Sequence, residues 1–306
     1  VSDPQPKTAL TALIGGSETV TEVSTADELT AAIADSNVIT VKLTGDISIS
    51  NSLTVNRIVT LDLNGHVLKY ESANKGSVIV VEGSGNLTLT DSNTTAVHKF
   101  TPDTNGLWVL DEASGTETVT GGVITGGTGY PILLYGSSYY YYGGGVYIAS
   151  SGQLTMTGGN IIGCSATYGG GVCTDSEQTV KFSMSGGSIA GCVASDIGGG
   201  VRASGTFQMS GQAVIRSCTA ESATQFVCGG GVYVNGSSSF KMSDTAKIEG
   251  CQALSTSSNS SNGGGVYVSS SSSFVMSNEA KIEGCQAISN SSKSSKGGGV
   301  FLANGT

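Results

Sequence analysis

The chain has 306 residues, of which only 12% are charged, and its formal net charge is -9. Nucleic acids and anionic membrane surfaces attract basic proteins, so this acidic balance excludes both as partners. The sequence contains no apolar run of the length that spans a membrane, and we expect no membrane insertion by this segment.

Residues 1–23 precede the regular part of the chain. They show no strong hydrophobic period, and they contain two prolines and two glycines, at Pro4, Pro6, Gly15 and Gly16. Such a stretch is typical of the residues that follow a removed signal peptide. We predict that residues 1–23 are a leader or linker.

A short helix is predicted from about Thr25 to Asp35. Thr25-Ala-Asp-Glu28 is a capping-box pattern, in which the first and fourth residues satisfy each other's free backbone N–H groups. Leu29, Ala32 and Ile33 follow at helical spacing. A helix placed just before the first strand would cover the open end of a stack of strands, which would otherwise invite aggregation.

Strand alternation follows the helix. Apolar residues recur at every second position in short runs separated by turn residues: Ile39, Val41, Leu43, Ile47, Ile49, Leu53, Val55, Val59, Leu61 and Leu63. Asp62 and Asp91 fall at an outward position and in a turn, and we expect both to be solvated. Residues 96–129 are less regular and hold the only tryptophan, Trp108, so they are expected to form a coil or two with a long excursion.

From residue 143 onward the tripeptide Gly-Gly-Gly followed by Val returns six times, and the spacing between its copies grows from 26 to 34 residues. Each of the first five copies is followed by a short apolar strand, an aromatic-or-Leu/x/Met step and an Ile-x-Gly-Cys-x-Ala piece or a close variant. A fixed period of this size indicates stacked coils. The three pieces predict three strands per copy.

Stacked coils place equivalent side chains above one another, so the repeats predict internal columns of Val, Phe, Met, Ile and Cys. Val146 and Ile148, and their counterparts in later copies, should point inward, whereas Tyr147, Tyr233 and Tyr267 should point outward. The density of Gly, Ser, Thr and Val disfavours helices.

Five of the seven cysteines share one repeat position: Cys164, Cys192, Cys218, Cys251 and Cys285. The simplest interpretation is a column of small, buried, free thiols. Parallel Cβ vectors on neighbouring coils suit a disulfide poorly, and no histidine joins this position to complete a metal site.

The region from about Ser24 to Thr306 resembles right-handed parallel β-helices of the pectin-lyase-like superfamily. The resemblance rests on Thr25-Ala-Asp-Glu-Leu-Thr-Ala-Ala-Ile33, Val59-Thr-Leu-Asp-Leu-Asn-Gly65 and the triglycine repeats, which are similar to those of adhesin-like cell-surface proteins of bacteria and archaea. It implies an all-β solenoid over residues 24–306 as a single domain. The chain stops partway into a further repeat, so we expect a longer natural polypeptide.

Enzymes of this fold cleave acidic polysaccharides, and they need acidic clusters for Ca²⁺ or paired carboxylates on adjacent coils. In the repeats, only Glu249 and Glu283 share a position, with Lys247 and Lys281 two residues earlier. This pattern is typical of a charged outer face with partial pairing. We therefore predict no catalytic residues, no metal site and no cofactor.

Six of the eleven tyrosines fall between Tyr130 and Tyr142, and four of them are consecutive. Four consecutive rings cannot all point inward on a strand, so some should face solvent and offer contact surfaces. An aromatic column that merely covers the coil is the alternative. The candidate ligand-binding residues are Tyr135, Tyr139, Tyr140, Tyr141 and Tyr142.

The sequence therefore favours a non-catalytic, adhesin-like protein of the cell surface or extracellular space. Glycans or host and matrix proteins are the expected ligands, and the protein is expected to be a monomer. Two alternatives remain, namely a polysaccharide lyase or glycoside hydrolase of the same fold, and a passive surface spacer.

Overall fold

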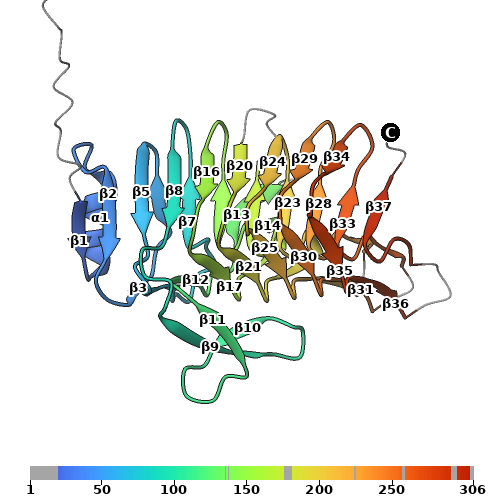
Figure 1. Ribbon diagram of the computed structural model, residues 1–306, viewed down its shortest axis with the longest axis horizontal. Coiled ribbons are helices and arrows are strands. Elements are labelled where there is room, and N and C mark those ends of the chain that lie inside the picture. Colours follow the sequence, from blue (N-terminus) through green and yellow to red (C-terminus); the bar gives the residue numbers. More distant parts are fainter. Residues whose placement is uncertain are drawn as a thin grey trace, which may run out of the picture.

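The computed structural model describes residues 20–134, 136, 138–175, 181–223, 225–256, 259–290 and 295–303. These residues form a rod of stacked coils, with helix α1 at one end (Figure 1). Apart from the antiparallel pair β13 (Tyr130–Leu134) and β14 (Ser138–Tyr142), neighbouring strands in each long sheet come from successive coils, so the sheets run along the rod. The predicted all-β parallel β-helix with an N-terminal helix is confirmed.

Helix α1 (Ala26–Ala34) covers the first coil. The Glu28 backbone N–H donates to Thr25 Oγ1 at 3.3 Å, and the Thr25 N–H donates to Glu28 Oε2 at 3.1 Å, which completes the predicted capping box. Leu29, Ala32 and Ile33 are buried on the face that meets the strands. No helix in the described part of the chain is long and apolar enough to cross a membrane.

Two of the long sheets, named sheet 1 and sheet 2, carry the aromatic/x/Met steps and the isoleucines of the repeats. Sheet 1 consists of β1 (Val20–Val23), β2 (Thr40–Leu43), β5 (Ile58–Asp62), β8 (Asn86–Thr90), β16 (Gln153–Met156), β20 (Lys181–Met184), β24 (Thr206–Met209), β29 (Ser239–Met242) and β34 (Ser273–Met276). Sheet 2 consists of β3 (Ile47–Ile49), β6 (Val67–Tyr70), β12 (Val123–Thr125), β17 (Asn160–Ile162), β21 (Ser188–Ala190), β25 (Val214–Arg216), β30 (Lys247–Glu249) and β35 (Lys281–Glu283).

The other two long sheets flank the triglycines: a strand of sheet 4 precedes each corner and a strand of sheet 3 follows it. Sheet 3 consists of β4 (Leu53–Val55), β7 (Ile79–Val81), β15 (Val146–Ile148), β19 (Val172–Thr174), β23 (Val201–Ala203), β28 (Val232–Val234), β33 (Val266–Val268) and β37 (Val300–Leu302). Sheet 4 consists of β13 (Tyr130–Leu134), β14 (Ser138–Tyr142), β18 (Ser165–Tyr168), β22 (Val193–Ile197), β26 (Thr219–Ser222), β27 (Val227–Cys228), β31 (Gln252–Ser255), β32 (Ser261–Asn262) and β36 (Gln286–Ser289).

The number of strands per coil changes along the rod. An early coil has three strands, such as β5, β6 and β7, whereas a repeat coil has four or more, such as β15, β16, β17 and β18. The prediction of three strands per repeat is therefore wrong. The third piece of the repeat, Ile-x-Gly-Cys-x-Ala, divides into two strands because the chain turns within it. At this turn Gly250 adopts a φ of +61° and the Cys251 side chain is buried.

The predicted internal columns are confirmed by the strand register. Leu154, Phe182, Phe207, Phe240 and Phe274 are register partners, as are the five methionines two residues later in the same strands. The Phe207 ring stacks on the rings of Phe182 and Phe240, and the ring centres lie 4.6 Å apart in both pairs. Like residues thus fill the core in the same way from coil to coil.

The cysteine column is also as predicted. All seven cysteines are free, and the column is buried except at Cys285, which is half-buried. Each Sγ in the column lies against the carbonyl oxygen two residues earlier. Burial raises the pKa of the Cys192, Cys218 and Cys251 thiols well above the ordinary value, so these thiols remain neutral.

Residues 97–120 form a separate antiparallel sheet that projects from the rod (Figure 1), made of β9 (Val97–Pro102), β10 (Trp108–Leu110) and β11 (Glu117–Thr120). This excursion sheet folds back onto sheet 2. Trp108 is buried there against Ile162 and Ala190, and its backbone N–H donates to Gly191 O at 2.9 Å. His98 is structural, because its Nε2 lies 2.9 Å from Gly65 O and its Nδ1 lies 2.8 Å from Glu112 Oε1.

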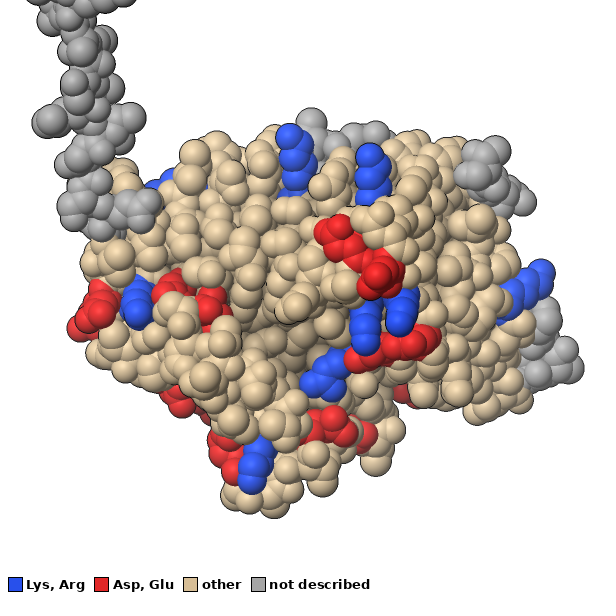
Figure 2. All heavy atoms as spheres, in the orientation of Figure 1, with Lys and Arg blue, Asp and Glu red and all other residues tan. Residues whose placement is uncertain are grey.

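Charged side chains gather in a few groups on the face shown in Figure 2, and one mixed group lies over β25, β30 and β35. There Lys247 and Glu249 are register partners of Lys281 and Glu283. Lys247 Nζ lies 3.9 Å from Glu283 Oε1. This is the predicted outer face with partial pairing, and such exposed pairs contribute little to stability.

Candidate ligand-binding site

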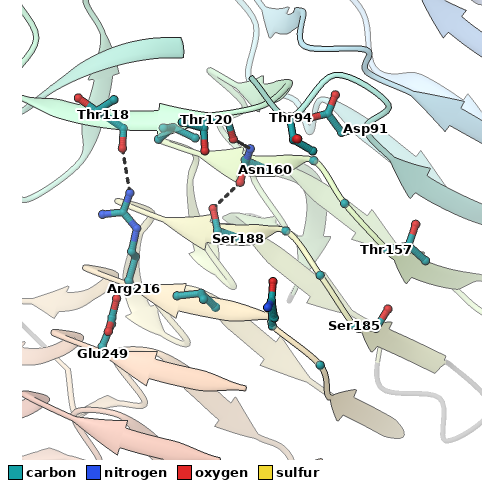
Figure 3. A pocket seen from close by; sticks show the side chains of 18 residues that line it. Asp91, Thr94, Thr118, Thr120, Thr157, Asn160, Ser185, Ser188, Arg216 and Glu249 are labelled. Carbon is teal, nitrogen blue, oxygen red and sulfur yellow. Dashed lines mark hydrogen bonds between the residues drawn. The ribbon is translucent and has the colours of Figure 1, made fainter. Parts of the chain in front are cut away.

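Two hollows on the side of the rod could hold a ligand. The first, named the polar groove, is a cavity of about 720 Å³ between the excursion sheet and the turns that join sheet 1 to sheet 2 (Figure 3). Hydroxyl, amide and glycine residues dominate its lining, which includes Thr94, Thr118, Thr120, Thr157, Gly158, Gly159, Asn160, Ser185, Ser188 and Gln212.

The polar side chains of this groove are engaged with the protein. Asn160 Nδ2 donates to Thr120 O at 2.9 Å, and Ser188 Oγ donates to Asn160 Oδ1 at 2.6 Å (Figure 3). Arg216 at the far end donates to Thr118 O at 3.3 Å, and its guanidinium lies 4.6 Å from the centre of the Trp108 ring. These contacts fasten the excursion sheet to the rod.

Asp91 and Asp62 are buried, so the expectation that they are solvated is wrong. Asp91 Oδ1 accepts from Gly65 N at 2.7 Å and its Oδ2 accepts from Gly122 N at 2.8 Å. Asp62 Oδ1 accepts from the backbone N–H groups of Asn64 and Ser92. Turns between stacked coils leave N–H groups without strand partners, and these carboxylates satisfy them. Asp91 therefore serves as a structural acceptor in the polar groove.

The second hollow, named the corner groove, is a cavity of about 410 Å³ beside the triglycine corners, lined by Asp196, Ile197, Gln225, Phe226, Cys228, Tyr233, Asn259 and Tyr267. Two rows of residues flank the triglycines along the chain, namely the residues that precede them and the residues after the valines that follow them. The first row is Tyr142, Tyr168, Ile197, Cys228, Asn262 and Lys296, and the second is Tyr147, Cys173, Arg202, Tyr233, Tyr267 and Phe301.

Aromatic rings form a column along this groove. The rings of Tyr233 and Tyr267 stack with their centres 5.1 Å apart, and those of Tyr267 and Phe301 lie 5.4 Å apart. Stacked rings cover each other's faces, so their edges and the phenol hydroxyls are what a ligand can reach. Phe226, 59% exposed, adds an apolar ring at the rim.

The consecutive tyrosines belong to the hairpin of β13 and β14, which pair antiparallel, and β14 continues into sheet 4 through β18. Tyr139 is 59% exposed. The Tyr140 ring stacks on Tyr168 with centres 5.8 Å apart, and the ring of Tyr142 lies 5.0 Å from that of Tyr168. Lys75 Nζ lies 4.1 Å from the centre of the Tyr141 ring. Tyr135 lies outside the described residues.

The tyrosines of the outward column differ in solvent exposure between the two ends of the column. Tyr233 and Tyr267 are half-buried beside the groove, whereas Tyr147 is only 3% exposed. The rings of Tyr130 and Tyr142 lie 5.2 and 5.9 Å from the ring of Tyr147. The hairpin therefore covers the first member of the column and leaves the later members at the surface.

One acid, Asp196, lines the corner groove, and one cation, Arg202, is the register partner of the lining residue Tyr233. Burial raises the pKa of Asp196 to about 6, although a hydrogen bond from Tyr168 and the charge of Arg202 act in the opposite direction. Burial likewise raises the pKa of the Cys228 thiol to about 12. The sequence singles out Arg202, because it occupies a repeat position at which other copies have Tyr or Cys. It does not single out Asp196, Gln225 and Phe226, because they lie in the variable stretch before the triglycine and match no repeat position.

Among the described residues, no group of three or more His, Cys, Asp or Glu side chains is arranged to hold a metal ion. The stacked coils define a solenoid protein of the parallel β-helix class. Residues 20–121, the amino-terminal third of the chain, match the family model described as "putative pectate lyase-like adhesive domain". No curated protein and no solved structure matches the chain significantly. The resemblance expected from the sequence is thus confirmed, and the family description supports an adhesin-like function at a surface or outside the cell.

Proposed function

We propose that this protein is an exported, monomeric adhesin that binds glycans along the corner groove and leaves them chemically unchanged. The observation that carries the proposal is the regular aromatic column of Tyr233, Tyr267 and Phe301 beside the polar groups of Asp196, Gln225 and Asn259. Sugars present both hydroxyls and apolar C–H faces, and a groove that alternates phenol hydroxyls, amides and ring edges matches both.

The geometry of the coil supports an extended ligand. Equivalent groups recur at about 5 Å along the rod because neighbouring parallel strands have that separation. A linear oligosaccharide advances by a similar distance per sugar, so one sugar could meet one coil. The tyrosine hairpin belongs to sheet 4, which also contributes Asp196, Ile197 and Cys228 to the groove, and Tyr139, Tyr140, Tyr141 and Tyr142 would extend the contact surface along that sheet.

The test is a glycan and matrix-protein binding array with three forms of the protein. The wild type should bind a subset of glycans. Changing Tyr233 and Tyr267 to Ser should abolish that signal, and changing Tyr139–Tyr142 to Ser should weaken it. The matched control changes Gln208 and Lys241 to Ala, since these exposed register partners lie on sheet 1, on the coil that holds Tyr233 and on the coil before it.

Each alternative gives a different result in the same assay. Loss of binding in the sheet 1 control, with binding retained in the Tyr233 and Tyr267 variant, would place the site elsewhere and overturn the proposal. Release of shortened or unsaturated sugars from a bound polysaccharide would instead indicate a lyase or hydrolase. Binding to no glycan or matrix protein would favour a passive spacer.

A further inference from the structure

We propose that the corner groove holds an oxyanion of the ligand, a carboxylate or a sulfate ester, against the guanidinium of Arg202. This inference rests on the proposed function and deepens it, because it assigns a charge to the glycan. It comes from the position of one cation that has no carboxylate oxygen within 4.0 Å among the described residues.

Arg202 lies in β23, in the outward column between Cys173 and Tyr233. Its guanidinium carbon lies 5.5 Å from the centre of the Tyr168 ring and 5.9 Å from that of Tyr142. Contacts of this kind with aromatic rings are favourable to a cation. They do not neutralise its charge.

The hydrogen bonds of Arg202 are few and long. Nη1 donates to Thr174 O at 3.3 Å and lies 3.6 Å from Cys173 Sγ. Nε is buried and has no hydrogen-bond partner, and Nη2 makes no hydrogen bond to any described residue. A guanidinium carries five N–H donors in a planar fork, so most of the donors of Arg202 lack a partner among the described residues.

No described side chain neutralises this cation at close range. None of the described residues places a carboxylate oxygen within 4.0 Å of the guanidinium. Burial raises the pKa of the adjacent Cys173 thiol, so that group remains neutral. Asp196 is the acidic group that acts on Arg202 from sheet 4, and it is hydrogen-bonded to Tyr168.

A partly buried cation without a close counter-ion is unfavourable unless an anion pairs with it. An oxyanion that approached from the groove would accept from two N–H groups of the fork, and such charge-assisted bonds are about twice as strong as neutral ones. Arg216, the other arginine on the outside of the repeat coils, already contacts Thr118 O and lies 3.9 Å from Glu117 Oε2. It therefore provides the matched control.

The first experiment measures anion binding without any glycan. Thermal unfolding is followed in sodium acetate, sodium sulfate and sodium chloride at equal ionic strength, for the wild type, Arg202→Met and Arg216→Met. Sulfate stabilises most proteins by exclusion from their surface, so the informative quantity is the difference between variants. Acetate and sulfate should raise the melting temperature of the wild type and of Arg216→Met more than that of Arg202→Met. An anion that binds only the folded protein stabilises it, and Arg202→Met lacks the binding site.

The second experiment measures affinity for oligosaccharides of one length that are neutral, carboxylated or sulfated. The acidic oligosaccharides should bind the wild type roughly tenfold to a hundredfold more tightly than the neutral one. Arg202→Met should remove this preference, and Arg202→Lys, which keeps the charge but loses the fork, should retain part of it. Circular dichroism establishes that each variant is folded.

The outcomes separate the two proposals. If anions stabilise the wild type through Arg202 but no oligosaccharide binds, the anion site stands and the glycan function fails. If neutral and acidic oligosaccharides bind equally to the wild type and to Arg202→Met, the glycan function stands and the anion site is overturned. Equal responses of the wild type and Arg202→Met to acetate and sulfate would also overturn the anion site.

Discussion

The Cγ2 atom of Ile248 lies only 2.8 Å from the point that a Cβ atom on Gly231 would occupy. Gly231 is the third glycine of its triglycine, and Ile248 is the isoleucine of the same repeat. The same relationship joins Gly145 to Ile161, and Gly265 to Ile282. The glycine at the corner and the isoleucine that fills the space beneath it are therefore one packing unit, which is why the sequence repeats them together.

This unit predicts the effect of adding one methyl group. Gly231→Ala would place its Cβ against Ile248 and also 2.7 Å from Gly265 O of the next coil. Overpacking of this kind costs roughly 1–3 kcal/mol of folding free energy. The midpoint of urea unfolding should fall accordingly. The control is Gly236→Ala, where the nearest atom is Ser270 O at 3.8 Å and little change is expected. Equal midpoints for the two variants would contradict this account.

A second prediction concerns the stacked phenylalanines. Phe207 is fully buried between Phe182 and Phe240, so Phe207→Ala removes two stacking contacts and leaves a cavity in mid-rod. The expected loss is roughly 3–5 kcal/mol. Phe274, half-buried and 5.0 Å from Phe240, should lose less when changed to Ala. Urea unfolding of both variants checks the order, and a larger loss at Phe274 would be inconsistent with a continuous internal column.

The columns could be predicted from the sequence because they depend on a period that the chain itself displays. Phe207 aligns with Phe240 in the repeat, and coils stacked in register bring the two rings together. The division of the third repeat piece into two strands was missed, because the direction of the chain at Gly250 depends on its φ and not on the hydrophobic pattern.

The surfaces were less predictable for a different reason. The contact of Trp108 with Gly191 and the burial of Asp91 between Gly65 and Gly122 join residues far apart in the sequence that share no repeat position. The tyrosine cluster was visible as a break in the repeat. That no described residue places a carboxylate close to Arg202 could be learned only from the arrangement of its neighbours.

The contact between Trp108 of the excursion sheet and Gly191 of the rod gives a third prediction. A Cβ atom on Gly191 would lie 2.0 Å from Trp108 Cγ, so Gly191→Ala should displace the excursion sheet from sheet 2. Trp108 is the only tryptophan, and its fluorescence emission should shift to longer wavelength as the ring meets water. The repeat coils should stay folded, because their columns do not include Trp108.

Gly250 is the matched control for this variant. It occupies the same repeat position with a similar positive φ, +61° against +55° at Gly191, but the nearest atom to its added Cβ is Ser217 Oγ at 3.9 Å. Gly250→Ala therefore carries the same backbone strain without the collision, and its emission should match that of the wild type. Unchanged emission in a folded Gly191→Ala protein would show that Trp108 is not held by this contact.

The acid in the corner groove gives the fourth prediction. Burial raises the pKa of Asp196 to about 6 from an ordinary value of 3.8. Between these two values the folded state holds the proton more tightly than the unfolded state, so stability falls as pH rises through this window. A difference of about two pKa units corresponds to about 3 kcal/mol. Asp196→Asn cannot ionise and should escape this loss.

The comparison of wild type with Asp196→Asn isolates this carboxyl from the other acids that titrate in the same range. Relative to its value at pH 3.5, the stability advantage of Asp196→Asn over the wild type should grow by about 3 kcal/mol by pH 7. Urea unfolding at half-unit steps of pH measures it directly. A stability difference that stays constant between pH 3.5 and pH 7 would mean that Asp196 titrates alike in the folded and unfolded chains, and that burial beside Tyr168 and Arg202 does not govern its charge.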